Sequence, residues 1–212
     1  RSLAASHVHR LLQGLLALPG SVLRSMIART QFAITGEDTR YFLNGAQLVL
    51  KGESMTLVAT DGHRLALVTV PRPGASGEAE TKVILPKKTL MELAKLLDGD
   101  VEVRYEHGEN HLFFHVGDRL LISRKIDGQF PPYDQVIPKD NDRAVVVSRA
   151  ALVDALKRVA LMSSDKTWGV RFGLEKGKLR IESDNPDLGA AKEEIDVPYK
   201  GQALQIGFNA RY

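Results

Sequence analysis

The chain has 212 residues and a formal net charge of +3 at pH 7, with 43% hydrophobic and 26% charged residues. This is the composition of an ordinary globular protein of one or two domains. It has no cysteine, which excludes disulfides, thiol chemistry and cysteine-ligated metal. No apolar run approaches the ~20 residues that span a bilayer. The sequence predicts a cytoplasmic protein with no membrane segment and no cofactor.

The first half of the chain predicts a helix, strands, a second helix and more strands. A cluster of leucines in the segment 1–18 is compatible with a short amphipathic helix, and this segment has no assigned role. Pro19-Gly20-Ser21 predicts a helix start capped by Ser21. Apolar periodicity then indicates helices over 22–33 and 86–97. Alternating apolar residues predict strands over 41–50, 55–60, 65–70, 82–86, 101–106, 111–116 and 119–126.

The second half repeats this order after a proline-rich connector, 127–140. A strand at 144–148 and a helix at 149–162 precede strands at 169–175, 178–184, 190–199 and 204–208. Such a repeat predicts two similar domains, 19–140 and 141–212. In the first copy a helix follows the last of the corresponding strands. The chain ends at Tyr212 before any equivalent helix, so we expect an incomplete second copy.

Positive charge is concentrated on the predicted helices. They hold eight basic and two acidic residues, a net charge of +6, while the remaining 21 basic and 24 acidic residues sum to −3. Lysine and arginine often only solvate an amphipathic helix, but such helices usually carry matching glutamates. The imbalance therefore favours a surface that faces phosphates without reading bases. The basic residues are Arg24, Arg29, Lys87, Lys88, Lys95, Arg149, Lys157 and Arg158.

No motif of a catalytic or metal site stands out. Asp61 and His63 are a conceivable acid/base pair, but Asp61-Gly62 is a strong hairpin-turn signal because Gly62 accepts positive φ. His111 and His115 share one face of a predicted strand but lack the further ligands of a metal site. Nucleophile-elbow and phosphate-loop motifs are absent from the sequence. The favoured interpretation of 57-LVATDGHRLALVTV-70 is a hairpin.

Several separate motifs, in order, resemble the bacterial sliding clamp family, the beta subunit of DNA polymerase III. They are 28-ARTQFAI-34, 38-DTRYFLNG-45, 57-LVATDGHRLA-66, 83-VILPKK-88, 127-DGQFPPY-133, 164-SDKTWGVRF-172 and 206-IGFNARY-212. The resemblance implies an α+β clamp fold of repeated domains, with antiparallel sheets outside and helices lining a central hole. It places this chain at the middle domain and part of the third, without the first domain and the end of the third.

The resemblance also implies a function. A full clamp is a homodimeric ring that encircles double-stranded DNA and acts as a non-catalytic processivity factor. It tethers the DNA polymerase III alpha subunit, the clamp loader and other proteins that carry a clamp-binding peptide. The basic helix residues would then face DNA together with Tyr41 and with Phe42, which replaces the family's usual second tyrosine. Leu161 and Met162 match the edge of the third domain that meets the partner subunit.

A hydrophobic pocket for the clamp-binding peptide is a further implication. Its far wall belongs to the C-terminal tail of a full clamp. Gln135 stands where some relatives have arginine, which would alter one polar contact. The positions that match this pocket are Leu43, Thr60, Gly62, His63, Arg64, Leu65, Pro131, Gln135 and Val136.

Two other functions stay open at this level. A hydrolase using Asp61 and His63 would lose turnover in a His63→Ala variant. A protein-interaction module that reuses the fold would keep its DNA behaviour when the three lysines of the helix 86–97 are reversed to glutamate. Core packing is also an ordinary role for Leu43 and Leu65.

Overall fold

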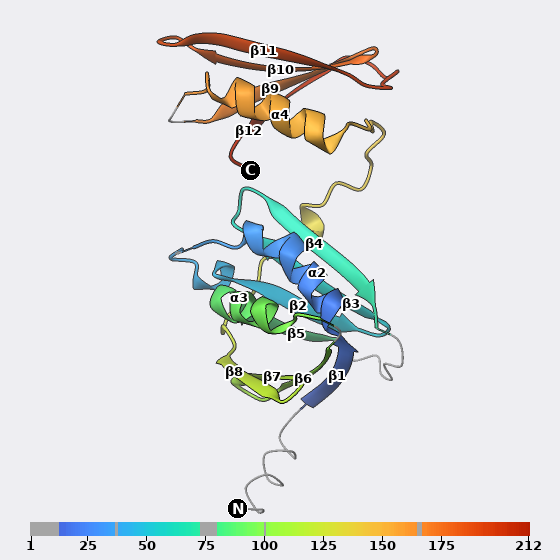
Figure 1. Ribbon diagram of the computed structural model, residues 1–212, viewed down its shortest axis with the longest axis vertical. Helices are drawn as coiled ribbons and strands as arrows, with labels where there is room; N and C mark the ends of the chain where they lie inside the picture. Colours follow the sequence, from blue (N-terminus) through green and yellow to red (C-terminus); the bar gives the residue numbers. More distant parts are fainter. Residues whose placement is uncertain (1–12, 37, 73–79, 100, 165–166) are drawn as a thin grey trace, which may run out of the picture. The chain divides into compact units, whose positions relative to one another are not determined.

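The computed structural model describes residues 13–36, 38–72, 80–99, 101–164 and 167–212, and the side chains of the first strand from Ala17 on. The chain divides into two compact units, Arg1–Pro132 and Tyr133–Tyr212, within the predicted connector (Figure 1). The sequence-based limits 19–140 and 141–212 place the boundary later in that connector and stay predictions.

The first unit combines two antiparallel four-stranded sheets with helices α2 and α3. One sheet has the order β1-β6-β7-β8 and the other β4-β3-β2-β5. Its helical elements are α2 (Gly20–Thr30), η1 (Gln31–Ala33), η2 (Tyr41–Leu43) and α3 (Lys87–Leu96). Its strands are β1 (Gln13–Pro19), β2 (Gly45–Lys51), β3 (Ser54–Thr60), β4 (Leu65–Pro71), β5 (Thr81–Pro86), β6 (Glu102–His107), β7 (His111–Val116) and β8 (Arg119–Arg124).

One hydrophobic core holds this unit together. Leu23 of α2, Leu90 of α3, Leu48 of β2 and Phe114 of β7 all belong to it, and each is 3% exposed or less. The apolar stripes of both helices and one apolar face of each sheet therefore leave water together, which is the main source of stability in such a layered unit. Four basic residues of these helices, Arg24, Arg29, Lys88 and Lys95, are exposed, and Lys87 is half-buried.

The start of the chain departs from the predicted pattern in two places. From Gln13 the leucine-rich segment is strand β1, paired with β6, and not a helix. Its earlier residues lie outside the described part. Helix α2 begins at Gly20, with Pro19 as N-cap and no side-chain cap, so Ser21 is a helical residue and not the cap. Pro19 ends β1 and its fixed φ, −60°, already suits the transition into a helix.

Two predicted strands are also shorter or absent. Residues 41–43 form the 3-10 turn η2, in which Leu43 N–H donates to the Arg40 carbonyl at 2.8 Å, so the strand begins at Gly45. Residues 144–148 form no strand. Val145 and Val147 pack on the second core while Val146 is 78% exposed. The alternation is real, but this segment has no ladder partner within the described residues.

The second unit is one antiparallel sheet of order β11-β10-β9-β12 with helix α4 on one face (Figure 1). Its core includes Ala155 and Val159 of α4 and Ile181 of the sheet. Its elements are η3 (Tyr133–Gln135), α4 (Arg149–Ala160), β9 (Gly169–Glu175), β10 (Lys178–Asn185), β11 (Gly189–Asp196) and β12 (Leu204–Asn209).

The predicted internal repeat is confirmed by sheet connectivity. In both β2–β5 and β9–β12 the third strand is at one edge, the fourth at the other, and the first lies next to the fourth. Gly45 pairs with Pro86 in the first unit, and Gly169 pairs with Asn209 in the second. Each sheet is preceded by a helix, α2 or α4, that packs against its second and third strands.

Candidate functional site

The turn between β3 and β4, residues 60–65, is held by its own polar groups. The Asp61 carboxylate accepts from the backbone N–H groups of His63 and Arg64, both at 2.9 Å. The Thr60 hydroxyl donates to the Arg64 carbonyl at 2.7 Å and accepts from the Gly62 N–H at 3.0 Å. Gly62 has φ +87°, a conformation that favours glycine. The hairpin predicted from this stretch is confirmed.

Both carboxylate oxygens of Asp61 accept hydrogen bonds within this turn. Burial acts to raise the pKa of its carboxyl, but the two backbone N–H donors and the Arg64 guanidinium outweigh burial and lower it. The second carboxylate oxygen accepts from Arg64 Nε at 3.1 Å. An anion whose oxygens already serve as acceptors is a poor general base. The local geometry therefore favours a structural role over acid/base chemistry with His63.

Two arginines tie the turn to the rest of the unit. Arg64 Nη2 donates to the Phe32 carbonyl at 2.6 Å, and the guanidinium lies over the Phe32 ring at 5.4 Å. Arg40 Nη2 donates to the Asp61 carbonyl at 3.4 Å and to Asp38 at 2.7 Å. Sequence reasoning assigned Arg40 no role beyond its place in the motif 38-DTRYFLNG-45. Its one sequence signal is the nearby acid in Asp38-Thr39-Arg40.

The pocket residues predicted in this unit differ in exposure. Leu43 is buried, at 1%, and Thr60 is nearly so, at 8%. Gly62 and His63 are exposed, while Arg64, Leu65 and Pro131 are half-buried. Leu43 is connected to the turn through Arg40. The Arg40 carbonyl accepts from the Leu43 N–H, and the Arg40 side chain reaches the Asp61 carbonyl.

The start of the connector packs along the first unit. Ile126 N–H donates to the Ile84 carbonyl at 3.0 Å. Gly128 has φ +124°, and a Cβ built on it would lie 3.3 Å from the Tyr41 ring. Tyr41 is 56% exposed and contacts Phe42 edge to face, with ring centroids 5.9 Å apart. The predicted DNA-facing pair thus lies on η2, between Arg40 and Leu43.

Half of the eight basic helix residues have partners within their own unit. Arg24 pairs with Asp98 at 3.0 Å, and Lys95 pairs with Glu92 at 2.8 Å. The other two engaged cations are Arg158, which holds Glu193 through two nitrogens, and Lys87, which donates to the Ile34 carbonyl. The exposed residues with no acidic partner among the described residues are Arg29, Lys88, Arg149 and Lys157.

The remaining predicted site residues belong to the second unit. Leu161 follows α4 as its C-cap and is 75% exposed, and Met162 beside it is half-buried. Gln135, at the end of η3, is exposed, and 69% of Val136 is exposed.

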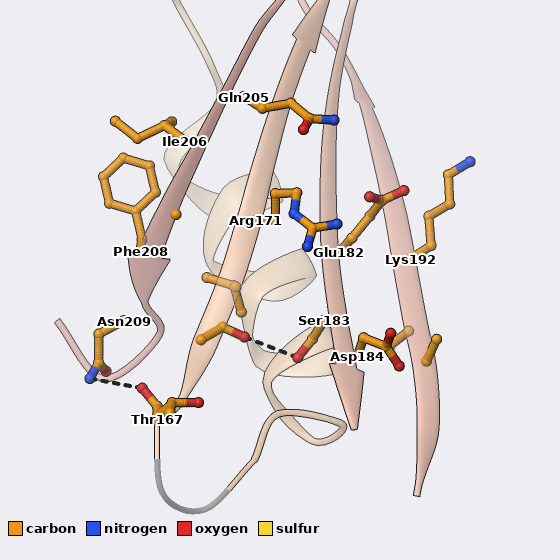
Figure 2. A pocket seen from close by; sticks show the side chains of 15 residues that line it. Thr167, Arg171, Glu182, Ser183, Asp184, Lys192, Gln205, Ile206, Phe208 and Asn209 are labelled. Carbon is orange, nitrogen blue, oxygen red and sulfur yellow. Dashed lines mark hydrogen bonds between the residues drawn. The ribbon is translucent and has the colours of Figure 1, made fainter. Parts of the chain in front are cut away.

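A hollow of about 870 Å³ lies on the second unit's sheet, and sequence reasoning did not predict it. Figure 2 shows Arg171, Glu182 and Gln205 projecting from the strands while the helix passes behind them. The strand alternation gives the same result, because the neighbours Val170 and Ile181 face the core. Glycine and alanine supply part of its lining. None of the residues predicted for DNA, peptide or subunit contact lines this hollow.

Across the described ranges, histidine, aspartate and glutamate side chains form no group of three or more suited to holding a metal ion. Within those same ranges, none of the helices has the length and apolar character needed to cross a membrane.

Helix-backed antiparallel sheets of one connectivity, repeated along the chain, are the architecture of a DNA clamp. Two family models match this chain: the DNA polymerase III beta subunit central domain over residues 17–132, and the C-terminal domain of that subunit over residues 134–212. The chain belongs to the family of DNA polymerase III beta subunits, the beta sliding clamps. This confirms the resemblance found in the sequence.

Curated relatives and solved structures point to the same family. The beta sliding clamps of Pseudomonas putida and Escherichia coli K12 are 42% and 39% identical over 196 residues, which is 92% of this chain and 53% of each relative. A sliding clamp crystal structure from Pseudomonas aeruginosa has TM-score 0.90 and 38% identity, covering 94% of this chain and 55% of that one. The Caulobacter crescentus polymerase III beta structure has TM-score 0.85 and 38% identity, covering 95% and 55%.

This chain thus spans about half the length of the relatives it matches. Another structure, from Pseudomonas aeruginosa, is a sliding clamp bound to griselimycin, with TM-score 0.90 and 38% identity, covering 94% of this chain and 54% of that one. Sliding clamps are non-catalytic, as the sequence predicted for this chain.

Proposed function

We propose that this chain is the DNA-facing and peptide-docking portion of a ring-shaped sliding clamp, a processivity factor that encircles duplex DNA. The observation that carries the proposal is the match to the central and C-terminal clamp domains, over residues 17–132 and 134–212. A clamp must hold DNA topologically and still slide, so diffuse attraction to phosphates suits it better than base readout. Cations on the exposed faces of the helices supply that attraction.

The free cations are the first candidates for phosphate contact. Arg29, Lys88, Arg149 and Lys157 are exposed and have no acidic partner among the described residues. The engaged cations must first exchange an existing partner, which lowers their net gain from a phosphate. Tyr41 and Phe42 complete the proposed DNA-facing set.

Charge reversal tests the DNA face. Lys88→Glu combined with Lys157→Glu should weaken duplex binding and reduce the slope of log K against log salt by about 1 per phosphate contact removed. The matched control is Arg119→Glu with Lys176→Glu, which changes net charge equally at exposed positions outside the helices. Equal weakening in both variants would contradict the proposed face and leave only a net-charge effect.

Encirclement has its own signature. An assembled ring that contains this chain should stay on closed circular DNA at high salt and leave when the circle is cut once. Retention that survives linearisation would contradict topological binding. We infer that Leu161 and Met162 take part in ring closure. A Leu161→Asp substitution should then lower retention on circles without changing the salt slope of duplex binding.

The second part of the proposal is a docking surface for a short peptide of the polymerase alpha subunit, the clamp loader or another partner. In the first unit it comprises Leu43, Thr60, Gly62, His63, Arg64, Leu65 and Pro131. Half-buried apolar groups beside a polar, conformationally fixed turn suit the insertion of one or two apolar anchors. The contributions of Gln135 and Val136 stay predictions.

A labelled hexapeptide ending in Leu-Phe provides the binding test, with an Ala-Ala ending as its control. Fluorescence anisotropy should show saturable binding of the first peptide only, and Leu65→Asp should abolish it. Griselimycin is a ligand of a related clamp, and it should compete with the peptide. Equal binding of both peptides would contradict a site that selects apolar anchors.

A further inference from the structure

Arg40 lies outside the predicted pocket, and its side chain reaches the turn 60–65 at Asp61. Its guanidinium is held by Asp38 through Nε at 3.0 Å and Nη2 at 2.7 Å. The same Asp38 carboxylate also accepts from the Arg40 backbone N–H at 2.8 Å. Two nitrogens on one carboxylate fix the plane of the guanidinium as well as its position.

The fixed guanidinium lies against the tip of the turn. Nη2 donates to the Asp61 carbonyl at 3.4 Å. A Cβ built on Gly62 would lie 3.1 Å from Arg40 Nη1 and 3.6 Å from Nη2. Arg40 therefore contacts the turn at Asp61 and Gly62, the two residues before His63. The other side of the turn is tied down by Arg64, which reaches the Phe32 carbonyl.

The backbone of Arg40 connects the same point to Leu43. Leu43 N–H donates to the Arg40 carbonyl at 2.8 Å, closing the first turn of η2. The Arg40 side chain contacts the turn while its backbone places the buried leucine. Arg40 thus connects Leu43, an apolar residue of the proposed docking surface, to the polar turn 60–65.

We propose that Arg40 is a positioning residue that holds the turn 60–65 in the conformation that receives the peptide. The inference rests on the proposed peptide-docking function, and it adds a residue that acts through the turn. Asp38 orients the guanidinium. Gly62 leaves space for it and has φ +87°, a conformation that favours glycine.

The geometry predicts that lysine cannot replace Arg40. A single ammonium group cannot hold Asp38 by two nitrogens and reach the Asp61 carbonyl from the same plane. A role that depends on charge alone would survive Arg40→Lys, whereas the positioning role would not. Asp38→Asn should reproduce the defect, because it releases the guanidinium while leaving Arg40 in place.

Amide hydrogen exchange of the intact chain measures the turn directly. The N–H groups of Gly62, His63 and Arg64 are bonded to Thr60 and Asp61. In Arg40→Gln and Arg40→Lys their exchange should be faster by about fivefold, the upper end of what an exposed charged contact contributes. Exchange in the core strand β3 should be unchanged, which excludes global unfolding as the cause.

Peptide affinity is measured on the same variants with the Leu-Phe hexapeptide and griselimycin. Both substitutions of Arg40, and Asp38→Asn, should weaken the peptide about fivefold. The matched control is Arg104→Gln. It removes an exposed arginine 3.8 Å from Glu102 on strand β6, in neither proposed surface. This control should leave turn exchange and affinity within twofold of the parent chain.

The outcomes separate the two proposals. Unchanged exchange and affinity in Arg40→Gln, or full recovery in Arg40→Lys, would overturn the positioning role. Faster exchange with unchanged affinity would also overturn it, because the turn would then not need to be fixed for docking. A parent chain that binds neither probe overturns the peptide function itself, and turn exchange then decides alone whether Arg40 holds the turn.

Discussion

Leu85 and Phe208 occupy equivalent positions in the two repeated sheets, but only Leu85 is buried. Leu85 pairs with Ala46 one step from the Gly45–Pro86 pair, and Phe208 pairs with Val170 one step from the Gly169–Asn209 pair. Leu85 is 0% exposed and Phe208 is 47% exposed. In the first unit the following helix α3 packs on β5. The sheet of the second unit is backed by α4 alone among the described elements.

This difference predicts unequal costs of truncation. Leu85→Ala should destabilise the first unit by about 3 kcal/mol, because it leaves a cavity in a closed core. Phe208→Ala should cost the second unit only about 1 kcal/mol, since about half of the ring is already in water. Urea denaturation followed by unit-specific hydrogen exchange would give both values. Equal costs would contradict the burial of these two positions.

The Asp61 turn predicts a stability effect without catalysis. Asp61→Ala removes the acceptor of two backbone N–H groups and should cost about 1–2 kcal/mol. His63→Ala changes an exposed side chain and should alter stability by less than about 0.5 kcal/mol. Thermal denaturation of the two variants checks this. A hydrolytic activity of the chain that disappears in His63→Ala would instead support the acid/base alternative.

The acid dependence of stability should shift in Asp61→Asn. Because the pKa of Asp61 is lower in the folded than in the unfolded chain, ionised Asp61 stabilises the fold above the unfolded pKa of about 3.9. That contribution is lost as pH falls through the folded pKa. The asparagine variant should therefore lose less stability than the parent chain between pH 5 and 2 in urea titrations.

Glu194 is the centre of an ion-pair cluster on the second sheet. Its carboxylate accepts from Lys178 at 2.9 Å, Lys192 at 3.2 Å and Arg180 at 3.2 Å. These donors, Lys178 first, lower the pKa of Glu194 to about 2. Its stabilising contribution is present above the unfolded pKa and is lost as pH falls toward 2.

Glu194→Gln should reduce the loss of stability that the second unit shows as pH falls toward 2. It should also reduce the salt sensitivity of that stability. The control is Asp184→Asn, an exposed acid on the same sheet with no ion-pair partner among the described residues. Urea midpoints at pH 7 and pH 3, each at low and high salt, check the prediction. A control that behaves like Glu194→Gln would show that only net charge matters.

His107 should make the stability of the first unit sensitive to mild acid. Burial, together with the Lys125 charge, lowers the pKa of its imidazole, and its Nδ1 is buried with no hydrogen-bond partner among the described residues. The unfolded chain therefore binds a proton at higher pH than the folded chain. Stability should fall as pH drops from about 6.5 toward the folded pKa. His107→Gln should remove this slope, and His111→Gln, at an exposed position, should keep it.

Strand and helix periodicity predicted most of the elements, and two of the misses have causes that periodicity does not contain. The turn η2 reads as the start of a strand because Tyr41, Phe42 and Leu43 are all apolar. Side-chain hydrogen bonds from Asn44 and Thr35 fix the preceding loop instead. The segment 144–148 alternates like a strand, but a strand also needs a ladder partner, which no local pattern can supply.

The sequence by itself determined the repeated clamp fold, the hairpin at Asp61-Gly62 and the excess of positive charge on helices. These follow from local periodicity, turn chemistry and ordered motifs. Tertiary structure alone decided which cations are already paired, that Leu43 is buried, and that Arg40 contacts Gly62. These depend on which groups far apart in the sequence come within hydrogen-bond reach, as Arg158 and Glu193 do, and a one-dimensional pattern does not contain such distances.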